Sequence, residues 1–471
     1  MSYDDRGLTS NTTAGDSVTG SSVTGNSASR LLIAAAAAFC AYFCMYAFRK
    51  PFTAATFEGP AMWGLGLKTV LVLSQLFGYT LSKFIGIKVV SEMRSEYRAL
   101  AIIGLIGLAE VALIGFAFLP LPLKVVMIFL NGLPLGMIFG LILSYLEGRK
   151  QTEALSAALC LSFIVSSGVV KSVGSWLIQE VGISEFSMPM VTGLIFFVPL
   201  LCSVWVLQAT PPPDQEDREL RTERVAMNNT DRRNFLRTYW PGLSLLIFVY
   251  IALTIVRTIR DDFAVEIWRD MGILETPSVF TTSEILVGIT VTAFSALTIW
   301  IKDSLLAIRV TVWLMCGAFA IVVASTVLQR AGSLSPFVFM VACGVGLYVP
   351  YVAFHTTVFE RLIAVARMPS NLGFLMYMAD SIGYLGYAII IVVRTQMKDA
   401  QLLLPFFQWS LLVAAGTSVV CLLAALIYFQ KVLSADQVSA RATPSETPLQ
   451  VTMETTAETK LEQTLENGSA I

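Results

Sequence analysis

Six basic side chains lie well inside apolar stretches of the sequence, away from their ends, and they are the groups best placed to do chemistry. They are Arg49, Lys50, Lys83, Lys171, Arg257 and Arg260. A guanidinium near the centre of a lipid bilayer costs at least ~2.5–3.5 kcal/mol on insertion scales, so it is retained only with a partner or a function. Arg suits a phosphate or carboxylate because its planar fork donates two parallel hydrogen bonds and stays ionised when desolvated. These residues predict an anion site inside a membrane protein.

Arg49 and Arg257 are the favoured pair for that site. Arg49 has no acidic residue within one helical turn, whereas Arg257 could pair along its own helix with Asp261 at i+4. Two guanidinium groups would clamp one anion, and the anion would relieve their mutual repulsion. A ligand shifts a conformational equilibrium only by its differential affinity for the two states. Relief of the repulsion between the two arginines supplies that difference, which favours exchange of bound anions over leak. Tyr42 and Tyr46 share the helix face of Arg49 and are expected to line the same aqueous cavity.

The remaining basic residues leave alternatives open. Lys83 could assist the two arginines or extend to the lipid headgroups, and Lys50, about 100° away from Arg49 around the helix, could also extend outward. Arg260 is expected to pair with a carboxylate close by in the sequence. The candidates are Asp261, Asp262 and Glu266.

Other ionisable residues in the apolar segments suggest coupling roles. Lys171 and Asp380, from opposite halves of the chain, could form an ion pair that breaks and re-forms, or a static one. Glu110 stands alone and is either a proton-coupling group, if burial favours its neutral form, or simply a neutral buried acid. His355 could assist binding or carry a proton, or it could be a packed residue that donates one hydrogen bond.

Three further glutamates are expected nearer the membrane surfaces. Glu147 and Glu360 are each followed within two residues by Arg, and they are expected to be gate residues that pair with loop arginines rather than substrate ligands. Glu284 is expected at the membrane interface.

The elements that must hold these residues are long apolar segments. The 471 residues are 55% hydrophobic and 14% charged, against about 25% charged in an ordinary soluble domain. A membrane-spanning helix needs ~20 apolar residues, and twelve such stretches occur, in two sets of six. They cover 31–57, 66–90, 99–119, 123–146, 154–179, 188–208, 240–267, 278–301, 307–328, 335–362, 371–395 and 404–430. We therefore expect an all-α integral membrane protein with twelve transmembrane helices.

Polar segments divide the chain into five expected parts. The two tails are poor in apolar residues and cannot repay the entropy of ordering, and the central gap opens with three prolines and is rich in charge. The parts are a disordered tail at 1–30, a six-helix bundle at 31–208, a linker at 209–239, a second six-helix bundle at 240–430 and a disordered tail at 431–471.

The basic residues also predict an orientation. Of the 32 Lys and Arg, twenty fall in the tails, the linker and one set of loops, and only six fall in the opposite loops. Positively charged loops resist translocation. We expect a multi-pass protein of a bacterial-type inner membrane, with both termini and the linker in the cytoplasm.

The two sets of spans repeat each other weakly. Residues 144–168 and 357–383 each contain a Glu, a following Arg and then a small or polar cluster, while Arg49 and Arg257 lie late in the first and seventh spans. Two pseudo-symmetric six-helix bundles related by an axis along the membrane normal bind their substrate near the midplane, between the bundles.

The six-linker-six plan resembles the major facilitator superfamily, and its local motifs resemble the organophosphate:phosphate antiporter branch. The matching segments are YAFRKPFTAATF (46–57), GYTLSKFIG (78–86), NGLPLGMIFG (131–140) and VYIALTIVRTIRDDF (249–263). The resemblance implies alternating access, with an Arg from each of the first and seventh helices gripping the substrate phosphate. Those positions correspond to Arg49 and Arg257, and the Lys of the second helix corresponds to Lys83.

The expected function is therefore secondary transport of a small organic anion, such as a phosphorylated metabolite exchanged for phosphate. Two alternatives stay open: a proton-coupled symporter of a neutral solute, and a membrane receptor with a transporter fold that moves nothing. The sequence shows no enzyme motif, no metal or cofactor motif and, with a net charge of -1, no basic surface for nucleic acid. The expected partners are the anionic substrate and the bilayer, and the expected state is a monomer.

Overall fold

The computed structural model is built from helices throughout the residues that it describes. These residues are 20–59, 61–146, 152–210, 229–273, 277–299, 301, 303–366, 372–395 and 403–442. The chain forms two compact units, Met1–Ala425 and Leu426–Ile471, and in the second of these the described residues are the last part of one helix.

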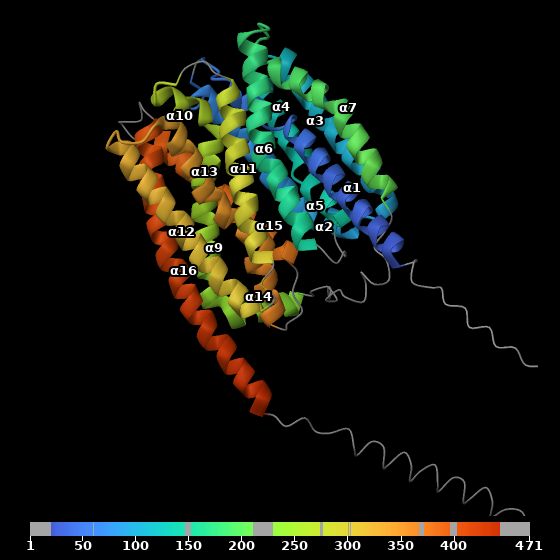
Figure 1. Cartoon of the computed structure of the whole chain (residues 1–471). Helices are drawn as coiled ribbons and strands as arrows, with labels where there is room; N and C mark the ends of the chain where they lie inside the picture. The colour runs from blue at the N-terminus through green and yellow to red at the C-terminus, as the bar shows by residue number, and fades with distance from the viewer. Residues whose placement is uncertain are drawn as a thin grey trace, which may run out of the picture. The chain divides into compact units, whose positions relative to one another are not determined.

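The N-terminal half contains helices that match the first six predicted spans. They are α1 (Gly20–Tyr46), the 3-10 helix η1 (Pro51–Ala54), α2 (Leu67–Glu92), the 3-10 helix η2 (Ser95–Tyr97), α3 (Arg98–Phe118), α4 (Leu121–Leu135), α5 (Ile138–Leu146), α6 (Thr152–Gln179) and α7 (Met188–Ala209). In Figure 1 these helices, coloured blue to green, form one group.

The C-terminal half matches the other six predicted spans. It contains α9 (Asn229–Asp262), α10 (Ala264–Asp270), α11 (Ser278–Ile299), α12 (Ser304–Arg330), α13 (Pro336–Ala353), the π-helix η3 (Phe354–Val358), α14 (Phe359–Ala366), α15 (Leu372–Thr395) and α16 (Leu403–Ala442). Both α1 and α9 begin before the corresponding predicted span.

Four predicted spans are interrupted close to residues of interest. The fourth span is divided at Gly136 and Met137 into α4 and α5. The first span ends as a helix at Tyr46, not at 57, because the chain turns before Pro51, which lacks a main-chain donor. The seventh is divided at Phe263 into α9 and α10. The tenth changes at Phe354 from an α-helix to a π-helix, a feature that is rare and is frequent at functional sites.

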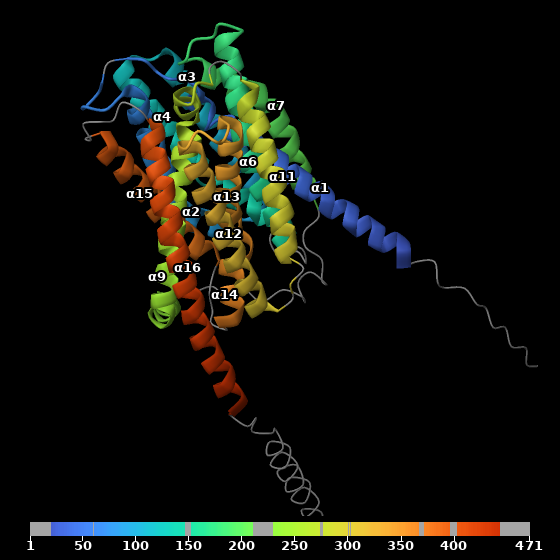
Figure 2. The ribbon, with the colours of Figure 1, turned by 60° about the vertical axis from the view of Figure 1, so that its left-hand side comes forward.

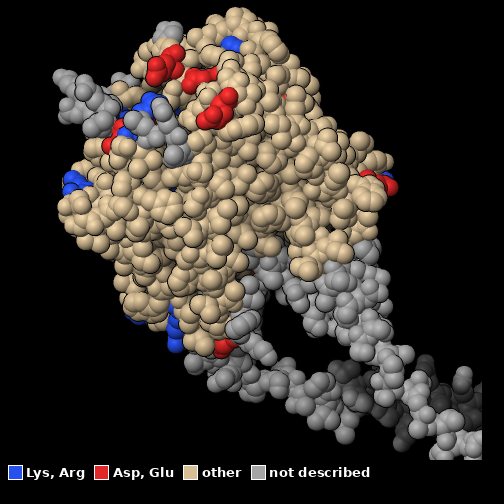
Figure 3. All heavy atoms as spheres, turned by 45° about the horizontal axis from the view of Figure 1, so that its top comes forward, with Lys and Arg blue, Asp and Glu red and all other residues tan. Residues whose placement is uncertain are grey.

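The outer surface of the helices suits a lipid environment. Within the described residues, ten helices are long and apolar enough to cross a membrane, and a shorter apolar helix covers Leu32–Tyr46. Large apolar side chains such as those of Trp205 and Trp313 point outward. On the face drawn in Figure 3, charged side chains are few; most lie toward the top of the view and the others at its edges.

The two halves meet along two helix pairs. Helix α6 packs against α11, and α2 packs against α15; α6 and α11 lie next to each other in both ribbon views (Figures 1 and 2). Gly168 of α6 approaches α11 so closely that a Cβ atom there would lie 2.5 Å from the carbonyl oxygen of Phe280. Residues from the two halves can therefore reach one another directly.

Candidate functional site

Arg49 lies in the turn that follows α1 and is held against an aromatic ring. Its guanidinium carbon lies 3.7 Å from the ring centroid of Tyr79 on α2, a distance typical of a cation–π contact. The residue is only 7% exposed, and its Nε atom has no hydrogen-bond partner. Among the described residues, no carboxylate forms an ion pair with Arg49.

Two amide side chains fix the turn that carries Arg49. Asn131 of α4 donates to the carbonyl oxygens of Phe48 (3.0 Å) and Ala109 (3.1 Å). Gln75 of α2 donates to the carbonyl oxygen of Arg49 (3.0 Å) and to Oδ1 of Asn131 (2.8 Å). Carbonyl groups at a helix end lack partners within the helix, so these amides satisfy them inside the protein. Sequence reasoning missed both residues, although paired polar side chains in apolar helices were a usable signal.

Close helix packing brings those amides together. A Cβ atom on Gly132 of α4 would lie 2.3 Å from the carbonyl oxygen of Gln75, and one on Gly136 would lie 2.7 Å from that of Tyr79. These positions require glycine because any larger residue would separate α2 from α4. The glycines therefore set the position of Tyr79 against Arg49.

Arg257 on α9 is the counterpart of Arg49 in the C-terminal half. Its guanidinium carbon lies 4.3 Å from the ring centroid of Tyr351 and 5.9 Å from that of Tyr348, both on α13. The residue is 6% exposed and its Nε atom has no hydrogen-bond partner. In the described part of the chain it forms no ion pair, so the alternative of an i+4 pair with Asp261 is wrong.

The two arginines share a set of tyrosines between the halves. Tyr46 and Tyr384 each interact electrostatically with both Arg49 and Arg257, and the rings of Tyr79 and Tyr384 meet edge to face at 5.6 Å. The sequence predicted an aqueous chamber around the arginines. The structure instead buries both guanidinium groups among aromatic rings, because the halves are in contact here.

Lys83 and Asp380 join the halves beside the arginines. The Lys83 ammonium on α2 forms an ion pair with Asp380 on α15, and Asp380 also accepts a hydrogen bond from the hydroxyl of Tyr250 on α9. The Tyr250 oxygen lies 3.5 Å from Nε2 of His355, whose Nδ1 lies 2.8 Å from the carbonyl oxygen of Tyr351. Lys83 therefore does not extend to the headgroups, and His355 packs in the π-helix within reach of Asp380.

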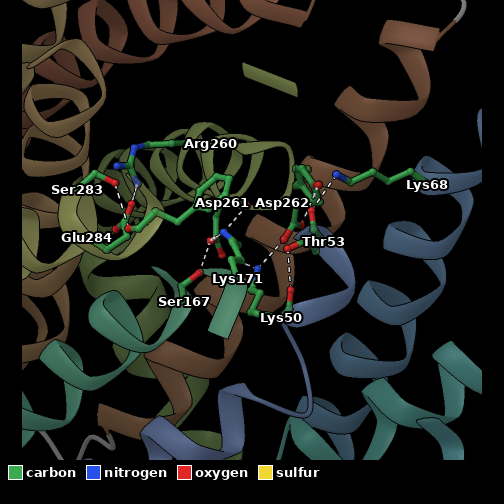
Figure 4. A network of polar contacts seen from close by, with 12 residues as sticks. Lys50, Thr53, Lys68, Ser167, Lys171, Arg260, Asp261, Asp262, Ser283 and Glu284 are labelled. Atoms are coloured by element: carbon green, nitrogen blue, oxygen red, sulfur yellow. Dashed lines mark hydrogen bonds and ion pairs between the residues drawn. The ribbon is translucent and has the colours of Figure 1, made fainter. Parts of the chain in front are cut away.

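A second group of charges, the inter-half ion network, lies beyond the arginines at the end of α9 (Figure 4). Lys50 pairs with Asp261 and Asp262, at 2.5 Å each. Lys171 of α6 pairs with Asp261 and also donates to its carbonyl oxygen (2.6 Å). Lys68 of α2 pairs with Glu266 at 2.6 Å. In each pair the cation comes from the N-terminal half and the anion from the C-terminal half.

The network corrects several expectations. Lys50 does not extend outward, because two carboxylates hold it between the halves. Lys171 does not pair with Asp380, since each has a different partner. Arg260 pairs across helices with Glu284 of α11 at 2.8 Å and donates to the carbonyl oxygen of Met340, so Glu284 is not an interfacial residue.

The other predicted residues are more scattered. Tyr42 is buried, with its ring edge to face with those of Tyr46 and Phe139. Glu110 is buried in α3, and Glu360 is partly buried at the start of α14. Glu147 lies outside the described residues.

This arrangement belongs to a known class of membrane-protein fold. The structure titled "Crystal structure of D-xylose-proton symporter" aligns with a TM-score of 0.55 at 14% sequence identity, and the alignment covers 84% of this chain and 96% of that chain. The proton:xylose symporter XylE bound to 6-bromo-6-deoxy-D-glucose aligns with a TM-score of 0.60 at 14% identity, over 86% and 95% of the two chains. The predicted all-α, multi-pass major facilitator fold is confirmed.

At the level of sequence, the chain belongs to a family of unknown function, DUF5690, whose profile matches residues 51–432. That match covers most of the chain, including Lys83, Arg257 and Asp380. No curated protein sequence matches the chain.

Proposed function

We propose that this protein is a secondary transporter of a small organic anion that works by alternating access. The observation that carries the proposal is the pair of buried guanidinium groups, Arg49 and Arg257, one from each half and neither ion-paired among the described residues. An uncompensated buried charge is strongly unfavourable. A substrate anion supplies the missing compensation.

The charges around the site favour a doubly negative substrate. Lys83 and Asp380 neutralise each other, and His355 is surrounded by aromatic rings, which leaves the two positive charges of Arg49 and Arg257. A phosphate monoester or a dicarboxylate carries the matching charge. The resemblance to organophosphate:phosphate antiporters makes a phosphorylated metabolite, exchanged for phosphate, the first substrate to try.

The inter-half ion network supports the conformational change that the proposal requires. Lys50 and Lys171 hold Asp261 and thereby close one end of the path between the halves. In the orientation that the basic residues predict, with both termini in the cytoplasm of an inner membrane, this is the outer end. An anion bound between the arginines draws the halves together, and its release lets them separate.

Counterflow in proteoliposomes tests the proposal. Vesicles loaded with phosphate or an unlabelled phosphate ester are expected to exchange it for labelled anion outside, without an imposed pH gradient. Arg49→Lys and Arg257→Lys retain the charge but lose the bidentate fork, so each is expected to reduce the exchange rate at least ~10-fold. Exchange that both variants retain at the wild-type rate contradicts the proposal.

One observation favours a second candidate, proton-coupled symport of a neutral solute. Asp380 is buried between Lys83 and Tyr250, with His355 close to the tyrosine hydroxyl, which is a chain of groups able to pass a proton. Two solved structures of similar fold are those of proton:xylose symporters. Uptake of a neutral sugar that needs an inward proton gradient, and that Asp380→Asn abolishes, would favour this candidate over anion exchange.

A further inference from the structure

Glu110 carries a buried acid group that the proposed anion site does not use. It lies in α3 with 6% of its surface exposed, and neither carboxyl oxygen has a hydrogen-bond partner. Gly193 of α7 is so close that a Cβ atom there would lie 2.3 Å from Oε2 of Glu110. Buried polar groups normally have hydrogen-bond partners, so the absence of any partner for the Glu110 carboxyl group needs an explanation.

The elements packed around Glu110 bring no compensating charge. Helix α7 presents Gly193 and contains no charged residue, and the turn after α1 presents the Phe48 ring, which also approaches Gly193. The single charged residue of α4, Lys124, donates to the carbonyl oxygens of Phe116 and Ala117 instead. Apart from Glu110, the one charged residue of α3 is Arg98 at its start, which donates to the carbonyl oxygen of Ser144. Among the described residues, Glu110 has neither a hydrogen-bond partner nor an ion pair, so this pocket fits the neutral acid and not the carboxylate.

A short path connects this acid to the anion site. The carbonyl oxygen of Ala109, the residue before Glu110, accepts a hydrogen bond from Asn131. The same amide holds Phe48, whose ring faces the Glu110 pocket, and contacts Gln75, which binds the carbonyl of Arg49. A change in charge at Glu110 therefore acts on the turn that carries Arg49.

We propose that Glu110 is a proton-binding site that couples the movement of the anion to the movement of a proton. In the conformation described here the carboxyl group holds the proton. When the protein changes conformation so that water reaches Glu110, the proton leaves to water and the carboxylate remains until it is reprotonated. The binding of the proton stands on the Glu110 pocket alone, whereas its coupling to an anion rests on the proposed function.

Infrared spectroscopy of the reconstituted full-length protein tests the proton site without any transport. At about pH 6, well above the ordinary glutamate pKa of about 4.3, the wild type is expected to show the carbonyl stretch of a protonated carboxylic acid. Glu110→Gln is expected to lose that band, while Glu58→Gln, at an exposed glutamate of the loop after η1, keeps it. Identical spectra for the wild type and Glu110→Gln would overturn the proposal.

Transport then tests the coupling. With inorganic phosphate or a phosphate ester as the probe, Glu110→Gln is expected to bind the anion and to perform counterflow like the wild type. It is expected to lose the extra accumulation that a proton gradient produces, and Glu110→Asp is expected to restore part of it. Accumulation by Glu110→Gln that still follows the gradient would contradict the coupling. If the wild type bound no anion, the proposed function would fail, and the infrared result would still decide the proton site.

Discussion

The guanidinium of Arg49 lies against the ring of Tyr79, 3.7 Å from its centroid, and has no ion-pair partner among the described residues. Arg260, equally buried, differs because Glu284 neutralises it at 2.8 Å. The two arginines therefore present two uses of a buried cation. Arg260 is compensated within the protein, and Arg49 is the one that we propose binds the substrate anion.

This difference predicts opposite effects on stability. Arg49→Met removes an uncompensated buried charge, so the ligand-free protein is expected to gain about 1–3 kcal/mol. Arg260→Met leaves the Glu284 carboxylate buried without its partner and is expected to cost about 3–5 kcal/mol. Thermal unfolding of the two variants in the same detergent measures the difference. A loss of stability in Arg49→Met as large as that in Arg260→Met would contradict the assignment of Arg49 to a ligand.

The pair of Lys83 and Asp380 predicts non-additive behaviour. Lys83→Met and Asp380→Asn each leave a buried group without its ionic partner, whereas the double variant removes both charges. The double variant is expected to be more stable than the sum of the single effects predicts, by about 0.5–3 kcal/mol. Unfolding free energies of the four proteins in a double-mutant cycle provide the measurement. Strict additivity would show that the ion pair adds nothing to the contact between the halves.

The inter-half ion network predicts a gate. Lys171→Met removes one of the two cations on Asp261. It is expected to open the cavity of about 200 Å³ that Ser175, one turn further along α6, lines. In a background without the native cysteines, Ser175→Cys is expected to react faster with an impermeant maleimide once Lys171→Met is added. Lys124→Met, outside the network, is the control and is expected to leave the rate unchanged. Equal rates in all three proteins would exclude Lys171 from gating.

Close contact between α2 and α4 predicts a steric effect at one glycine. A Cβ atom on Gly78 would lie 2.2 Å from the main-chain oxygen of Phe129. Gly78→Ala is therefore expected to lower stability by about 1–3 kcal/mol and to weaken anion binding, because Tyr79 moves with α2. Gly104→Ala, where a Cβ atom meets nothing within 4 Å, is expected to be neutral or stabilising by up to ~1 kcal/mol. Similar melting temperatures for the two variants would contradict this role of α2.

The sequence predicted the helices well and the partners of the charges poorly, for a physical reason. Apolar length depends on each segment alone, so each of the twelve predicted spans coincides with one or more helices of the structure, although four spans are interrupted. Partners such as Lys50 for Asp261 depend on how the two halves meet, and only neighbours along one helix can be inferred locally. The i+4 pair of Arg257 with Asp261 was such a local inference, and contacts with the other half override it.

The sequence around the end of α1 contained signals that the prediction of the first span did not use. Hydropathy extends the first span to 57, yet Pro51 marks a break in the helix, and the structure ends the helix at Tyr46. The amides Asn131 and Gln75 stood in apolar segments, where polar side chains need partners. Their shared contact with the turn before η1 becomes visible only when α2 and α4 are placed side by side.

Binding of a phosphate ester to purified protein, measured by calorimetry, tests the central claim most directly. The wild type is expected to bind it with a dissociation constant that rises at least ~10-fold in both Arg49→Lys and Arg257→Lys, whereas Arg260→Lys, whose partner is Glu284, keeps the wild-type value. A dissociation constant that none of these substitutions changes, with all three proteins folded, would contradict an anion site built by Arg49 and Arg257.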